Sequence, residues 1–139
     1  MTVSKETRDS RKKKTGEFFT PDDLINRLLD KAGEEAWSEN KTFLDPTAGN
    51  GNIVLAILKR KIEVYHHRPL TALSTIFAVE LMPDNVKEMK ERVSKYMLPL
   101  LQFKCEIDIL DLVLNYNFVC SDFFNWDFDK WQPKNLVNQ

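Results

Sequence analysis

The sequence predicts one α/β domain built on three parallel strands with flanking helices. Two observations predict it: apolar segments with helical spacing alternate with short β-branched and aromatic segments, and the strand-like segments end in polar loops. Right-handed crossovers between parallel strands bring such loops together at the carboxyl ends of the strands. A chain of 139 residues with 42% hydrophobic content suits one core and is too short for two ordinary domains. We expect helices on both faces of the sheet.

The first residues differ in composition from the rest. Residues 1–14 are polar and carry six cations against two acids. We expect a mobile basic arm there, and one domain over residues 15–139. The candidate nucleic-acid contacts are Lys12, Lys13 and Lys14, because cations bind phosphates. The alternative is a solvated arm that binds nothing.

The first helix is predicted from Pro21 to Trp37. Thr20 is a candidate N-cap, Pro21 suits the first helical position, and Asp22 and Asp23 complement the positive end of the helix dipole.

A short buried strand, Thr42–Asp45, then leads through a loop into a second helix, Ile53–Lys61. Residues 65–74 lack a clear period and are predicted to be irregular. The next strand is Thr75–Glu80, rich in β-branched and aromatic residues. The third helix runs from Pro83 to Pro99, where proline ends it.

Three elements complete the chain. They are a helix over Ile107–Leu114, a third strand over Asn117–Asp122, and an aromatic, acidic tail that begins at Phe123.

Three acids, Asp45, Glu80 and Asp122, end the three predicted strands, where ligands of parallel sheets bind. The loop after the first strand contains Gly49 and Gly51. Such loops most often hold phosphate, but this one lacks the P-loop lysine and the G-x-G-x-x-G spacing, and the carboxylate of Asp45 would repel a pyrophosphate.

A ligand with cationic groups suits these acids better. S-adenosylmethionine carries a sulfonium and an ammonium, and the glycines let the backbone pass close to its methionine part. Glu80 is placed to accept both ribose hydroxyls, and Leu81 and Met82 to flank the adenine. The alternative for Glu80 is an ordinary solvated acid.

Four segments resemble motifs of the amino-directed, adenine-specific DNA methyltransferases of restriction-modification systems and phages. "TGEFFTP" (15–21) resembles motif X, "DPTAGNG" (45–51) motif I, "VELMPDN" (79–85) motif II and "CSDFF" (120–124) motif III. Their joint order and spacing make the signal specific. The resemblance implies the N-terminal part of a Rossmann-like S-adenosylmethionine-dependent methyltransferase fold, with later strands missing.

The resemblance also implies roles for residues. The methionine end of the cofactor would meet Phe19, Thr20 and Pro21, and its amino acid moiety the loop with Asp45, Pro46, Gly49 and Gly51. Glu80 would hold the ribose, and Asp122 and Phe123 would meet the adenine.

The family's catalytic loop, a polar residue followed by Pro-Pro and an aromatic, is not found in the sequence. "WQPKN" (131–135) has one proline and no aromatic after it. No catalytic residue is therefore assigned. We expect a cofactor-binding module of a DNA adenine-N6 methyltransferase, acting in the cytoplasm of a bacterial or phage-infected cell, with another chain supplying catalysis and DNA recognition. The alternatives are a non-catalytic modulator of a methylation or restriction complex, and an RNA or protein methyltransferase module.

A partner chain also follows from the first strand. In the family's strand order this strand lies between strands two and four, so without a fourth strand its edge is open. We expect self-association or a second polypeptide along Thr42–Asp45.

Neither a metal nor a membrane partner is expected. His66 and His67 lack acidic or thiol partners at ligand spacing. Cys105 and Cys120 are predicted to be reduced thiols in or near the core. No apolar run approaches the length of a membrane span.

Overall fold

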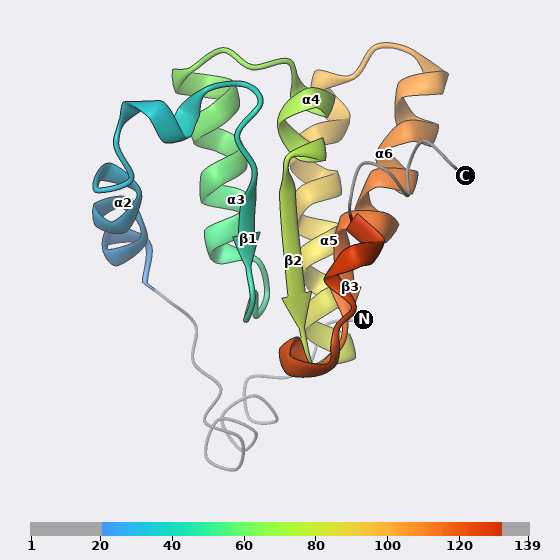
Figure 1. Ribbon diagram of the computed structural model, residues 1–139. Coiled ribbons are helices and arrows are strands. Elements are labelled where there is room, and N and C mark those ends of the chain that lie inside the picture. Colours follow the sequence, from blue (N-terminus) through green and yellow to red (C-terminus); the bar gives the residue numbers. More distant parts are fainter. Residues whose placement is uncertain (1–20, 132–139) are drawn as a thin grey trace.

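The computed structural model describes residues 21–131, which form an α/β domain with a three-stranded parallel sheet in the order β1-β2-β3. Figure 1 shows the strands side by side, with β2 in the middle. They are β1 (Phe43–Asp45), β2 (Ile76–Glu80) and β3 (Phe118–Cys120). The predicted α/β class and the three parallel strands are confirmed, each strand lying within its predicted segment.

Five α-helices and five short turns surround the sheet in the described residues. The helices are α2 (Asp22–Asp30), α3 (Asn52–Lys59), α4 (Pro69–Ser74), α5 (Pro83–Met97) and α6 (Lys104–Asn117). The turns are η1 (Glu34–Trp37), η2 (Arg60–Val64), η3 (Leu98–Leu100), η4 (Phe123–Asn125) and η5 (Phe128–Trp131).

The predicted helix over 21–37 is wrong in its extent. The structure has α2 and then, after Gly33 at φ 83°, the separate turn η1. Pro21 does not occupy the first helical position. Its extended backbone, with ψ 148°, makes it the N-cap, and its carbonyl accepts the amide of Ile25 at 3.0 Å. Thr20 lies outside the described residues.

The prediction that residues 65–74 are irregular holds for 65–68 and is wrong for the rest, because α4 covers Pro69–Ser74. Proline at the first position is a helix-start signal, but the helix is too short for its apolar period to stand out. The predicted helices over 83–99 and 107–114 are present as α5 and as a longer α6.

All the α-helices contribute to one apolar cluster with one face of the sheet. That face carries Phe43, Ile76, Ala78 and Phe118, which the strand register places together. Consecutive strands joined by right-handed crossovers put their connecting helices on the same side. The expectation of helices on both faces therefore does not hold for residues 21–131.

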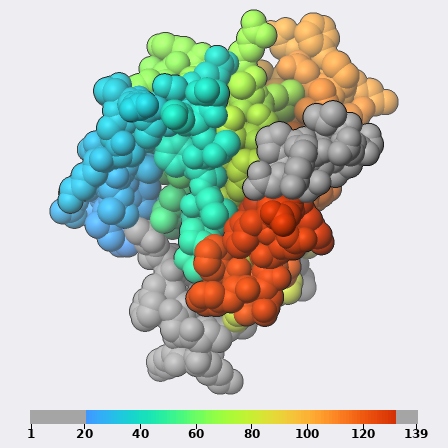
Figure 2. Space-filling model, viewed as in Figure 1, coloured from blue at the N-terminus to red at the C-terminus, as the bar shows by residue number. Residues whose placement is uncertain are grey.

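The opposite face carries Phe77, and the aromatic segment 123–131 packs there. The Trp131 ring lies 4.9 Å from the Phe77 ring, and its Nε1 donates to the carbonyl of Tyr116 at 2.9 Å. Figures 1 and 2 show this segment, in red, on the viewer's side of the sheet. The segment that follows β3 is thus held against the sheet.

A buried lysine lies in the wide helical turn η2, into which α3 continues. Lys61 is 0% exposed, and its Nζ donates to the carbonyl of Lys41 at 2.9 Å and to the Thr75 hydroxyl at 2.8 Å. Burial lowers the pKa of Lys61 to about 8. The ammonium therefore joins η2 to the residues that precede β1 and β2.

Candidate functional site

The loop between β1 and α3 is shaped by two glycines with positive φ. Gly49 has φ 56° and Gly51 has φ 92°. L side chains rarely adopt this region. A Cβ on Gly51 would lie 2.6 Å from the Cγ of Met89, so α5 also requires the small residue. The loop is held to the next strand by the amide of Ala48, which donates to the carbonyl of Val79 at 3.0 Å.

Glu80, at the end of β2, fixes this loop through its carboxylate. Its Oε1 accepts the amide of Gly49 at 2.9 Å. Its Oε2 accepts the amide of Met82 at 3.0 Å and the Nδ2 of Asn85 at 3.1 Å. The side chain is 8% exposed. Glu80 is therefore not a solvated strand-end acid, which removes that alternative.

Asp45 lies on the same face of the sheet as Glu80. The register places Asp45 opposite Ala78, two residues before Glu80, and side chains two apart share a face. Its Oδ1 accepts the amide of Thr47 at 3.2 Å, whereas its Oδ2 is buried and has no hydrogen-bond partner within the described residues.

The environment of Asp45 disfavours its ionised form. Burial raises the pKa of this carboxyl, the bond from Thr47 opposes the rise, and the charge of Glu80 adds to it. A buried acceptor without a partner costs free energy unless a ligand or water satisfies it. Within the described residues, Asp45 Oδ2 is thus an acceptor of the site that is open to a ligand.

The other residues predicted after β1 and β2 lie around these carboxylates. Pro46 and Leu81 are exposed, Leu81 at 58%, and Met82 is half-buried. The Met82 amide donates to Glu80 and its carbonyl accepts the amides of Asn85 and Val86, so the side chain is the part of Met82 best placed to contact a ligand.

Asp122 and Phe123 follow β3, as predicted, but they also stabilise their own turn. The Asp122 carboxylate accepts the Phe124 amide and the Asn125 Nδ2, each at 3.1 Å. The Phe123 ring lies between those of Phe124 and Phe128, at 5.5 and 5.4 Å. Phe124 itself is 89% exposed.

Several predicted site residues cannot be placed. Phe19, Thr20, Lys12, Lys13 and Lys14 lie outside the described residues. Pro21 is described, and it is exposed at the start of α2.

Sequence reasoning missed two residues that hold the site together. Asn85, in the first turn of α5, is fully buried beside Glu80. Arg92, further along α5, donates to the carbonyl of Asn50 at 3.0 Å and to Oδ1 of Asn52 at 2.7 Å. Asn85 lies one turn before the buried Met89 on α5, and Arg92 lies one turn after it. This spacing is a weak signal of a role in the site, because it can be recognised only once α5 is known to face the loop.

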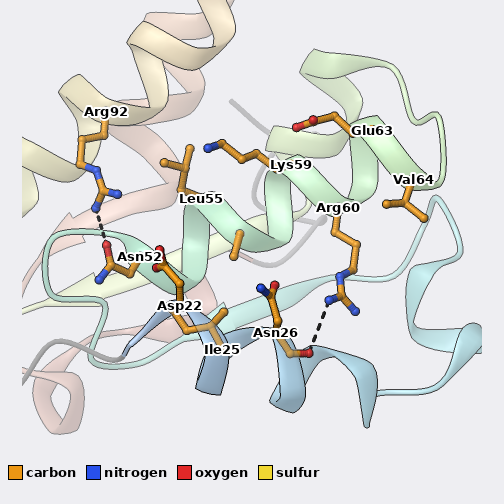
Figure 3. A pocket seen from close by; sticks show the side chains of 11 residues that line it. Asp22, Ile25, Asn26, Asn52, Leu55, Lys59, Arg60, Glu63, Val64 and Arg92 are labelled. Carbon is orange, nitrogen blue, oxygen red and sulfur yellow. Dashed lines mark hydrogen bonds between the residues drawn. The ribbon is translucent and has the colours of Figure 1, made fainter.

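A cavity of about 440 Å³ lies elsewhere, between α2, α3, η2 and α5. Figure 3 shows Arg92 reaching Asn52 and Arg60 reaching Asn26 in its walls. Its lining does not include Asp45 or Glu80; it comprises Asp22, Ile25, Asn26, Asn52, Leu55, Ala56, Lys59, Arg60, Glu63, Val64 and Arg92.

The histidine and cysteine side chains were considered in the sequence as possible metal ligands or core residues, and the structure shows where they lie. His67 is buried, and its Nε2 lies 2.9 Å from the carbonyl of Trp37. Cys105 and Cys120 are free thiols, but both are exposed, so the expectation of core positions is wrong. Within residues 21–131, no group of His, Cys, Asp or Glu is arranged to hold a metal, and no helix has the length and apolar character to span a membrane.

The residues of this arrangement can bind a ligand. They offer carboxylate acceptors and a closely approachable backbone at the carboxyl ends of adjacent strands. No family model, curated protein or solved structure matches the chain.

Proposed function

We propose that the chain is the S-adenosylmethionine-binding module of a DNA adenine-N6 methyltransferase with a partial Rossmann-like fold. The observation that carries the proposal is the buried Oδ2 of Asp45, which has no partner within residues 21–131 and lies beside Glu80 at the strand ends. Two buried carboxylates favour a ligand that brings a cation and hydroxyl donors. The resemblance of the surrounding segments to methyltransferase motifs favours S-adenosylmethionine as this ligand.

A catalytic loop is proposed to come from another polypeptide. The sequence contains six prolines, and no two of them are adjacent. The Pro-Pro-aromatic loop that would act on a flipped adenine therefore has no counterpart here. We place this second polypeptide along β1, whose Leu44 is 46% exposed at the edge of the described sheet.

One observation favours a second candidate function. Within residues 21–131, Glu80 accepts three hydrogen bonds from the chain itself, which also suits a carboxylate that only locks the loop. A non-catalytic protein that modulates a methylation or restriction complex would keep such a lock without binding the cofactor.

Calorimetric titration with S-adenosylmethionine separates the two candidates. The proposal predicts binding by the wild-type chain, with weaker binding by Asp45→Asn and Glu80→Gln. Asp30→Asn, which removes an exposed acid of α2, is the matched control and should bind as the wild type does. The absence of any heat from folded wild-type protein would favour the modulator.

Methyl transfer tests the wider proposal. Radiolabel should pass from S-adenosylmethionine to DNA only when a partner chain that carries the catalytic loop is added. Transfer by this chain alone would contradict the proposed need for a partner. Deletion of residues 1–14 should lower the salt-sensitive part of DNA affinity if Lys12, Lys13 and Lys14 contact phosphates.

A further inference from the structure

Asn85 is a fully buried polar residue that contacts the Glu80 carboxylate. It is 0% exposed and lies in the first turn of α5. Its Nδ2 donates to Glu80 Oε2 at 3.1 Å, and its own amide donates to the carbonyl of Met82 at 3.1 Å. The side chain is therefore fixed by the same turn that presents Glu80.

The hydrogen bonds to Glu80 limit what the carboxylate can still accept. A carboxylate offers about four acceptor directions. Gly49, Met82 and Asn85 occupy three of them. Among the residues that the structure describes, no donor takes the fourth direction, which is therefore open to a ligand. Its position depends on the rotation of the carboxylate, which Asn85 restrains at Oε2.

We propose that Asn85 is a positioning residue of the cofactor site: it holds Glu80 so that Oε1 locks the glycine loop and one acceptor direction stays open for a single ligand hydroxyl. The ligand part of this inference rests on the proposed function. The loop part does not, because it concerns contacts within the chain.

The substitution Asn85→Asp tests the proposal with almost no change in shape. It replaces the donor by a second carboxylate against Glu80. Two carboxylates in contact cannot both ionise readily, so the pair should bind one proton with a raised pKa. Among the described residues, the charge of Glu80 acts on Asp45, from the end of β1, and on Cys120, from β3, and Cys120 is in turn affected by Asp84 and Lys90 of α5.

Ligand affinity should then depend on pH in the variant. When the pair holds its proton, a donor again lies between the two carboxyl groups and the loop lock is restored. When the proton is lost, repulsion rotates Glu80 away. We expect affinity for S-adenosylmethionine to fall about tenfold or more from about pH 5 to about pH 8, beyond the change in the wild type.

Asn117→Asp is the matched control. Asn117 is also buried, at 4% exposure, and its Nδ2 donates to the carbonyls of Ser74 and Ile76 at 3.1 and 3.0 Å. These contacts lie at the amino end of β2, opposite the cofactor site. The control should lose stability as Asn85→Asp does, while its affinity should follow the wild-type pH profile.

A second readout requires no ligand. The Gly49 amide resonance should shift with pH in Asn85→Asp, because that amide donates to Glu80, and it should not follow the same titration in Asn117→Asp. If Asn85→Asp does not fold, Asn85→Ala should show weaker affinity and a shifted Gly49 resonance without the added pH dependence.

The outcomes separate the two proposals. Equal behaviour of the two Asp variants, or a Gly49 resonance that ignores residue 85, would overturn the role of Asn85 and leave the cofactor proposal standing. A wild-type chain that binds no S-adenosylmethionine would overturn the proposed function and the open hydroxyl direction, while the Gly49 titration would still decide whether Asn85 holds Glu80.

Discussion

The Oε1 of Glu80 lies 2.9 Å from the amide nitrogen of Gly49, a residue 31 positions earlier in the chain. This bond joins the end of β2 to the glycine loop after β1, and both groups are buried. The shape of the loop is therefore set by the neighbouring strand as well as by its own glycines.

Gly51→Ala should destabilise the fold strongly. Its φ of 92° is unfavourable for alanine, and the new Cβ would meet the Met89 Cγ at 2.6 Å. We expect a loss of about 2–4 kcal/mol in the free energy of unfolding, measured by urea denaturation. The added cost of Gly51→Ala should be smaller in a Met89→Ala background, since the contact with Met89 Cγ at 2.6 Å is then removed and only the closer-than-usual contact with Met89 Cβ at 3.1 Å remains. A substitution that costs nothing would show that the loop is not held against α5.

The open direction on Glu80 predicts that one ribose hydroxyl matters more than the other. Calorimetry should show that one of the 2′-deoxy and 3′-deoxy forms of the cofactor binds about tenfold more weakly, while the other keeps most of the affinity. Equal losses for both analogues would mean that Glu80 releases Gly49 or Asn85 and accepts both hydroxyls.

Cofactor binding should weaken in acid because of Asp45. Burial raises the pKa of this carboxyl, so it takes up a proton at higher pH than an exposed aspartate does. A protonated Asp45 no longer attracts a cationic ligand, so affinity should fall as the pH drops through the raised pKa. Asp45→Asn should bind weakly at every pH. A wild-type affinity that stays constant in acid would exclude a role for the charge of Asp45.

Lys61 predicts a second pH dependence, this time of stability. Its folded pKa of about 8 lies below its ordinary value of 10.5, so between these two values the unfolded chain binds more protons at this position. Stability contributed by this group therefore rises as the pH rises from about 8 to 10.5.

Urea denaturation of the wild type and Lys61→Met over that range measures the effect. The difference between their unfolding free energies should change with pH, because only the wild type carries this amine. Parallel curves for the two proteins would show that Lys61 has an ordinary pKa in the fold.

The exposed edge of β1 predicts association. Light scattering should show a concentration-dependent mass, or a stable complex with a partner chain, and Leu44→Lys should reduce either, since charged side chains protect open edges. Leu112→Lys, on the exposed side of α6, is the control and should leave the mass unchanged. A strictly monomeric chain that binds no partner at this edge would contradict the prediction.

The sequence could predict the strands and the acids at their ends because these follow from local composition and crossover rules. The buried stripe Val86, Met89, Val93 and Met97 of α5 was likewise visible as a helical period. The burial of Lys61 in η2 could not be predicted, because its acceptors are brought to it from the residues before β1 and β2 by the tertiary fold.

The sequence predicts which residues lie at the site but not the hydrogen bonds between them. Asp45 and Glu80 are found by their place after strands. That Glu80 already accepts three donors, one of them from Asn85, depends on how α5 packs against the loop. For the same reason, the sequence alone does not distinguish a hydrogen-bonded Glu80 from a solvated one.

Amide resonance mapping during titration with S-adenosylmethionine shows directly whether the cofactor binds at the carboxylates of Asp45 and Glu80. The largest shifts should occur at Gly49, Gly51 and Met82, which lie around these carboxylates. If no resonance shifts at saturating ligand, or if the shifts centre on cavity residues such as Asn26 and Arg60 while the glycine loop is unaffected, the cofactor does not bind at this site.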